Sequence, residues 1–161
     1  MRAALARLAR SLCRECGGRT VRAHNIHLTL VFLGNVPAGR RADLLALADT
    51  IAGPPFELTI DRHEYWRHNR IVWAGTARCP QPLRDLVAQL VRALRAMGFP
   101  CEEREYVPHI TLLRDARRAP AAQITGVIPW RAADFVLLQS VRRDGAVVYE
   151  IVKRWPLMPV V

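Results

Sequence analysis

The chain repeats one short pattern, H-x-T-L, at 27–30 and again at 109–112. Stretches 27–33 and 106–113 alternate in polarity and are rich in residues that favour strands, so both are predicted to be strands. Side chains alternate between the two faces of a strand. Each copy therefore presents its histidine and threonine on one face and its apolar residues on the other, which requires a core behind each strand.

The rest of the sequence predicts a mixed α+β chain. Both kinds of element are expected, with helices at 2–15, 40–52 and 82–97 and strands at 56–65, 70–76, 134–142 and 146–155. The last two strands are predicted to form a hairpin about Asp144 and Gly145, after a loop that contains Pro129. Each half has a helix, a motif strand and further strands, so we expect one bilobal, duplicated domain over residues 1–161.

The paired side chains of the two motifs suit chemistry at phosphate. An imidazole changes charge near neutral pH, so His27 and His109 can act as an acid and a base. A hydroxyl donates to phosphoryl oxygens, so Thr29 and Thr111 can hold the phosphate. This chemistry needs neither a metal nor a cofactor. One such motif alone is more often a structural histidine on a core strand, and the second copy is what favours catalysis.

The charge of the chain indicates a polyanionic partner. Lysine and arginine number 24 against 14 acidic residues, a formal charge of +10, and arginine dominates. The planar guanidinium matches phosphate oxygens, although a biased genomic base composition also produces arginine-rich chains. We find no apolar run of membrane-spanning length and no signal-peptide pattern, so a cytoplasmic location is expected.

Two other groups of side chains have the composition of a binding site. Cys13 and Cys16, with His24 and His27, superficially resemble a zinc site, but a buried helix face explains the cysteines more simply. A cluster near a hairpin turn has the composition of a base-stacking surface, although a solvated hairpin is the favoured interpretation. Its members are His63, Tyr65, Trp66 and His68.

The motifs and their flanks resemble the 2H phosphoesterase superfamily, and within it the bacterial and archaeal RNA 2′,3′-cyclic phosphodiesterases, formerly called 2′-5′ RNA ligases. The similarity extends from about residue 20 to the C-terminus. The matching stretches are NIHLTLVFLGNV, RIVWAG, YVPHITLLRDA and YEIVKRWPL.

The resemblance implies a bilobal α+β fold in which two antiparallel sheets form a V-shaped cleft with the helices outside. It implies hydrolysis of a ribose 2′,3′-cyclic phosphate to a 2′-phosphate. We expect the protein to be a monomer. His27 matches the proton donor to the departing 3′-oxygen, and His109 matches the base that activates water. The phosphate contacts implied by the resemblance are Thr29, Thr111 and Arg114.

The sequence departs from the family in one respect and leaves alternatives open. Family members usually begin with a short apolar strand, whereas helical sequence follows Met1 at once, so one sheet is expected to lack a strand. RNA 2′-5′ end joining and hydrolysis of a small cyclic nucleotide would use the same residues. A non-catalytic RNA-binding module is the third alternative, and two complete motifs disfavour it.

Overall fold

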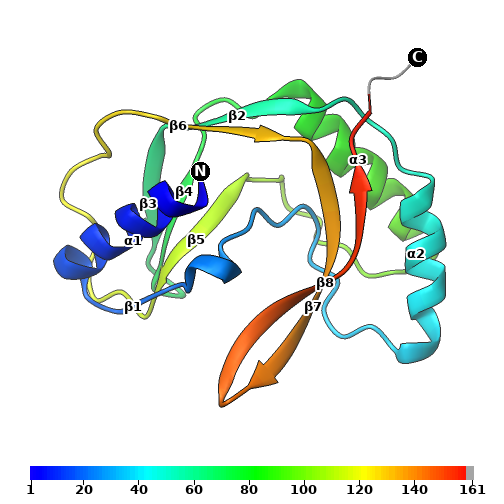
Figure 1. Ribbon diagram of the computed structural model, residues 1–161, viewed down its shortest axis with the longest axis horizontal. Helices are drawn as coiled ribbons and strands as arrows, with labels where there is room; N and C mark the ends of the chain where they lie inside the picture. The colour runs from blue at the N-terminus through cyan, green and yellow to red at the C-terminus, as the bar shows by residue number, and fades with distance from the viewer. Residues whose placement is uncertain (159–161) are drawn as a thin grey trace. The chain divides into compact units, whose positions relative to one another are not determined.

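The computed structural model describes residues 1–158, which form two compact units (Figure 1). The first unit combines 1–29, 58–78 and 108–130, and the second combines 30–57, 79–107 and the chain from 131 onward. Each unit is therefore assembled from three separate stretches of sequence. The units do not correspond to the N-terminal and C-terminal halves in which the sequence pattern suggested a duplication.

The first unit is built on a four-stranded antiparallel sheet in the order β1-β5-β4-β3. Its central strands, β4 and β5, carry fully buried side chains such as Val72, Ala74 and Ile110. Helix α1 packs against β5 and β1 (Figure 1). The elements are α1 (Arg2–Cys16), β1 (Arg19–Thr20), β3 (Arg62–Trp66), β4 (Ile71–Gly75) and β5 (His109–Arg114).

Helix α1 forms because apolar residues recur at helical spacing along one side of it. Leu5, Ala9 and Leu12 are buried on that side. The helix ends at Cys16 and is capped by Gly17. The next residue, Gly18, has a φ of 88°, which a side chain disfavours. A Cβ on Gly18 would lie 2.6 Å from the carbonyl oxygen of Arg114. This glycine therefore lets the chain turn tightly into β1, alongside the end of β5.

The second unit contains two helices and a long hairpin. Helix α3 (Gln81–Ala96) buries a leucine-rich face and packs against α2 (Arg41–Asp49), which follows a short 3₁₀ turn, η2 (Ala38–Arg40). Strands β7 (Asp134–Arg143) and β8 (Ala146–Pro156) pair along their whole length. Within this hairpin, the rings of Phe135 and Trp155 stack at 5.2 Å and are buried.

The predicted fold class is confirmed as α+β with antiparallel sheets. The three predicted helices and the terminal hairpin lie within a few residues of their expected bounds. Asp144 and Gly145 both have positive φ angles, as their hairpin turn requires. No helix within residues 1–158 is both long enough and apolar enough to span a membrane.

Two strand predictions need correction. The stretch 56–65 is divided into β2 (Phe56–Ile60) and β3, and the two strands belong to different sheets. The predicted loop around Pro129 contains β6 (Ile128–Ala132), which pairs with β2 in a two-stranded sheet. Proline is tolerated on an edge strand because its missing N–H can face away from the ladder, so Pro129 did not prevent pairing.

The predicted strand at 27–33 is wrong. A 3₁₀ turn, η1 (Ala23–Asn25), precedes this segment, and the residues that follow are assigned to no strand. Alternating polarity favours an extended chain, but a strand also needs a neighbour that supplies ladder hydrogen bonds. Within residues 1–158, no sheet includes this segment. Leu28 and Leu30 are accordingly half-buried rather than anchored in a core, and Phe32 is 70% exposed.

Candidate active site

The second motif lies on β5 as the sequence predicted. His109 and Thr111 are half-buried on one face, whereas Ile110 and Leu112 are fully buried on the other. Across the ladder, His109 is paired with Gly75 and Thr111 with Trp73. Directly paired residues in an antiparallel ladder place their side chains on the same face. Trp73 and Gly75 therefore border the imidazole and the hydroxyl of the motif.

A β-bulge brings Arg114 to the face that carries His109. Simple alternation along β5 would place Arg114 on the opposite face, with the buried side chains. However, Thr111 pairs with Trp73 and Leu113 pairs with Val72, so Leu112 and Leu113 together occupy one step of the ladder. Both leucines are fully buried, and the alternation resumes one residue later. Arg114, exposed at the end of the strand, thus lies on the same face as Thr111.

The first motif is positioned by the chain that leaves β1. Strand β1 runs antiparallel to the end of β5, with Arg19 opposite Arg114, and the Val21 N–H donates to the carbonyl of Leu112 at 2.8 Å. This direction leads the chain from the Arg114 end of β5 toward its His109 end. Both histidines and both threonines of the motifs belong to the first unit.

The ring of His27 is oriented by a backbone carbonyl. Its Nδ1 lies 2.6 Å from the carbonyl oxygen of Asn25, which is buried in the preceding turn. A carbonyl oxygen only accepts hydrogen bonds, so Nδ1 carries a proton and donates it. Proton exchange at this ring therefore falls to Nε2. Such an orienting contact is typical of histidines that act in acid–base chemistry.

An aromatic group that was expected on a solvated hairpin lies against His109. The ring of Trp66 is edge-on to the imidazole, with centroids 4.6 Å apart, and it packs on Trp73 at 5.2 Å. Trp73 is 1% exposed and so lies in the core. His68, which is exposed, has its ring 6.4 Å from that of Trp66. No sequence signal indicated the contact between Trp66 and His109, because it joins residues of distant segments.

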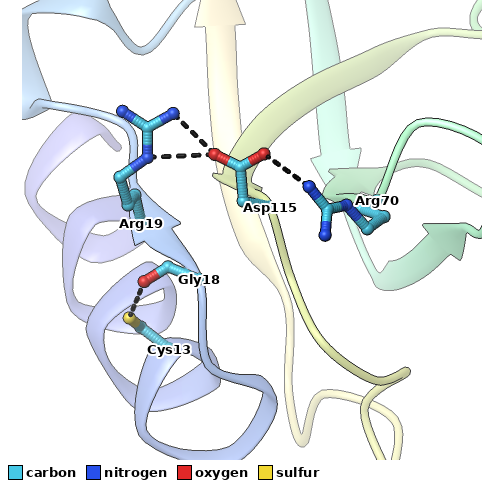
Figure 2. Close-up of polar contacts among 5 residues, drawn as sticks. All are labelled: Cys13, Gly18, Arg19, Arg70 and Asp115. Carbon is cyan, nitrogen blue, oxygen red and sulfur yellow. Dashed lines mark hydrogen bonds and ion pairs between the residues drawn. The ribbon is translucent and has the colours of Figure 1, made fainter.

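Basic residues gather at the end of β5. Figure 2 shows Arg19 and Arg70 reaching Asp115 from opposite sides. Arg19 approaches one carboxylate oxygen at 3.0 and 2.5 Å, and Arg70 approaches the other at 3.3 Å. The hydrogen bond from Arg19 and the nearby positive charges hold the pKa of Asp115 below its usual range. The Asp115 carboxylate thus holds Arg19 and Arg70 in place beside Arg114. These arginines outnumber the carboxylate, so the end of β5 keeps a net positive charge.

The two cysteines that resembled zinc ligands lie on α1 and differ in burial. Cys16 is buried on the inner side of α1, and burial raises the pKa of its thiol. Cys13 points its thiol toward the carbonyl of Gly18 at 3.5 Å (Figure 2). Among residues 1–158, no three His, Cys, Asp or Glu side chains are grouped as metal ligands would be. The helix-face interpretation thus fits Cys16, whereas Cys13 is only half-buried.

Comparison with known proteins identifies the class to which this fold and these motifs belong. A family model described as the 2′-5′ RNA ligase superfamily matches residues 2–144. The chain therefore belongs to this superfamily of 2H phosphoesterases, which confirms the resemblance seen in its motifs.

Individual relatives extend over most of the chain. The RNA 2′,3′-cyclic phosphodiesterase of Escherichia coli is 39% identical over 142 residues, 87% of this chain and 80% of that protein. The enzyme of the same name from Thermus thermophilus is 30% identical over 88% of this chain and 76% of its own length. The crystal structure of E. coli LigT complexed with 3′-AMP matches with a TM-score of 0.83 and 34% identity, covering 96% of this chain and 92% of that one.

Proposed function

We propose that this protein hydrolyses 2′,3′-cyclic phosphate ends of RNA to 2′-phosphomonoesters. Relatives that match most of the chain are named RNA 2′,3′-cyclic phosphodiesterases. The observation that carries the proposal is the presence of both histidine–threonine pairs in one compact unit, one of them with its imidazole fixed by a backbone carbonyl. We expect the protein to act as a cytoplasmic monomer, a single bilobal domain.

In the proposed reaction His109 is the base and His27 is the acid. The neutral imidazole of His109 accepts a proton from water, whose oxygen forms a bond to phosphorus. The bond between phosphorus and the ribose 3′-oxygen breaks. The imidazolium of His27 delivers the Nε2 proton to that oxygen, which leaves a 3′-hydroxyl and a 2′-phosphate. One proton is taken up and one is given, so the hydrolysis step leaves the charges of the pair exchanged. Proton exchange with water then returns His109 to its neutral form and His27 to its charged form.

The hydroxyls and the arginine act on the phosphate oxygens in this proposal. Thr29 and Thr111 each stand two residues beyond a histidine and donate to the non-bridging oxygens. Arg114 contacts a substrate phosphate, and the bulge that returns it to the face of Thr111 supports that role. A guanidinium is suited to it because its planar fork matches phosphate geometry.

The decisive test is product analysis on an oligoribonucleotide that ends in a 2′,3′-cyclic phosphate. We expect a 2′-phosphate end from the wild type and almost none from His27→Ala or His109→Ala. His24→Ala is the matched control, because His24 is an exposed histidine of the turn just before the motif. The same assay with a 5′-hydroxyl acceptor and with cyclic mononucleotides tests end joining and small-nucleotide hydrolysis. Full activity in both motif variants would refute the proposal.

A further inference from the structure

The excess positive charge of the chain belongs almost entirely to the first unit. That unit contains 13 arginines and 4 acidic residues, whereas the second contains 11 basic and 10 acidic residues. A genomic bias toward arginine raises the arginine content of both units, but it does not remove acidic residues from one of them. The unit that carries both histidine motifs is therefore the one whose surface attracts a polyanion.

A row of arginines runs along the outer side of α1. Arg7, Arg10 and Arg14 recur at helical spacing, are exposed, and lie opposite the buried side of the helix. Within residues 1–158, none of the three forms an ion pair with a carboxylate. The acidic residue of α1, Glu15, is instead engaged by the backbone N–H of Ala121. Like charges at this spacing destabilise a helix slightly, so helix stability does not explain the row.

A shallow hollow lies between this row and β1. It has a volume of about 350 Å³ and is lined by Arg10, Cys13, Arg14 and Thr20. Guanidinium groups and a hydroxyl all donate hydrogen bonds to phosphate oxygens, and the planar fork of a guanidinium matches phosphate geometry. The hollow therefore has the chemistry of a site for a phosphodiester of a nucleic-acid backbone.

Strand β1 connects the hollow to the face that carries the second motif. It is the outer strand of the four-stranded sheet and is only two residues long. Arg19 is the ladder partner of Arg114, which lies on the face of Thr111, whereas Thr20 lines the hollow beside α1. Successive side chains of a strand point to opposite faces. A polyanion that leaves the motif face over Arg19 therefore meets the hollow one residue farther along β1.

We propose that this surface, the arginine track, binds backbone phosphates of the RNA that precede its cyclic end. The track consists of Arg7, Arg10, Arg14, Arg19 and Thr20. The inference rests on the proposed function and narrows its substrate class to an RNA chain of several nucleotides rather than a cyclic mononucleotide. Contacts to phosphate carry no base information, so the track holds RNA ends of any sequence. It contributes to binding and takes no part in the chemical step.

The test compares a cyclic mononucleotide with an RNA of about eight nucleotides that ends in a 2′,3′-cyclic phosphate. Arg10→Gln/Arg14→Gln should raise the KM for the longer RNA about 5- to 30-fold at low salt and leave kcat/KM for the mononucleotide unchanged. Arg92→Gln/Arg95→Gln removes the same charge from exposed positions of α3 in the second unit, and this matched control should behave like the wild type. Glutamine favours helices about as well as arginine, so both variants should fold.

Direct binding separates this proposal from the proposed function. Fluorescence anisotropy measures the affinity for the same RNA with an inert 3′-hydroxyl end, which requires no catalysis. The slope of log Kd against log salt concentration should fall by about 1.4 in Arg10→Gln/Arg14→Gln, because two phosphate contacts to a single strand are lost. If the wild type hydrolyses no cyclic phosphate and the slope still changes in this way, the proposed function fails and the phosphate contacts stand.

Three results would overturn the arginine track. Equal losses of kcat/KM on the mononucleotide and on the longer RNA would show that Arg10 and Arg14 act through the fold. Equal losses in the α1 and α3 double variants would show a general effect of net charge. Loss of binding to polyglutamate with RNA binding intact would identify an acidic protein as the partner of this surface.

Discussion

The guanidinium of Arg19 donates two hydrogen bonds to one carboxylate oxygen of Asp115, and so ties β1 to the residue that follows β5. The two residues are 96 positions apart in the sequence. Asp115 has a φ of 57°, which turns the chain sharply as it leaves the strand. The ion pair therefore joins the chain segment that leads to the first motif to the end of the strand that carries the second.

Acid should weaken this connection. The hydrogen bond from Arg19 lowers the pKa of Asp115 in the folded protein. The charged carboxylate therefore stabilises the fold at any pH above the pKa that Asp115 has in the unfolded chain, about 4. This stabilisation is lost as the pH falls through the lower, folded pKa. Asp115→Asn should lower the melting temperature at pH 7, and the difference from wild type should shrink as the pH approaches the acid range. Asparagine tolerates a positive φ, so backbone strain is not added.

A change of ionic strength provides an independent check on this prediction. Arg19 is 79% exposed, so its attraction to Asp115 is screened by ions, and the difference between the two proteins should also narrow at high salt. Thermal melts between pH 7 and pH 3, at low and high ionic strength, measure both effects. A difference that stays constant across pH would mean that the carboxylate charge contributes nothing to folding.

The acid and base roles can be separated by the leaving group. Removing either imidazole should slow hydrolysis roughly 10²- to 10⁴-fold. On a nitrophenyl phosphodiester, whose leaving group needs no proton, His27→Ala should recover much of its rate and His109→Ala should not. The wild-type rate should be bell-shaped in pH, with limbs that belong to the histidine pair. Rescue of His109→Ala alone would reverse the assignment, and equal responses would leave it unsupported.

The threonines should contribute less than the histidines. Thr29→Val and Thr111→Val each remove one hydrogen bond to a charged oxygen and should slow turnover about 10- to 100-fold. Valine keeps the branched shape that suits β5, so Thr111→Val should melt close to wild type. Steady-state rates measure the loss of turnover in both variants, and the melting temperature of Thr111→Val measures its stability. A large drop in the melting temperature of Thr111→Val would point to a structural hydroxyl instead.

Gly75 should not tolerate a side chain. A Cβ at this position would lie 2.6 Å from the carbonyl oxygen of Pro108 and 2.6 Å from the ring of Trp73. Gly75→Ala should therefore destabilise the fold by about 1–3 kcal/mol and displace the start of β5, with loss of activity. Gly53→Ala is the matched control, because a Cβ there meets open space. Chemical denaturation of both variants measures the difference, and equal stabilities would contradict the expected clash.

Turnover should not depend on a metal ion. The proposed reaction uses two imidazoles and two hydroxyls, and none of its steps requires a Lewis acid. Dialysis against a chelator should leave the rate unchanged, and Cys13→Ser should do the same because its thiol is expected to hold no metal. Loss of activity on chelation, followed by recovery with a divalent ion, would contradict this prediction.

Local signals in the sequence were enough to predict the elements whose formation is local. Helix α3 has an apolar stripe, a proline in its first turn and Gly98 after its end. The hairpin of β7 and β8 has a two-residue turn with the residue types that positive φ angles favour. The face shared by His109 and Thr111 followed from alternation along one strand.

Features that depend on distant pairing could not be predicted in this way. Segment 27–33 has strand-like residues, yet whether they form a strand depends on a partner that periodicity does not reveal. The bulge at Leu112 and Leu113 is defined by the register with β4, and it alone decides the face on which Arg114 lies. The contact between Trp66 and His109 joins two strands separated by β4, so nothing in the neighbourhood of either residue indicates it.

The hydrogen bond between His27 and Asn25 uses the main chain of Asn25 rather than its side chain. Any residue that can follow the same turn offers the same carbonyl, so side-chain changes at position 25 leave this acceptor in place. Insertion or deletion of one residue between 23 and 27 would instead carry the carbonyl away from the ring. The length of this segment therefore matters more than its side chains for keeping the contact, so we expect relatives to differ here by substitutions rather than by gaps.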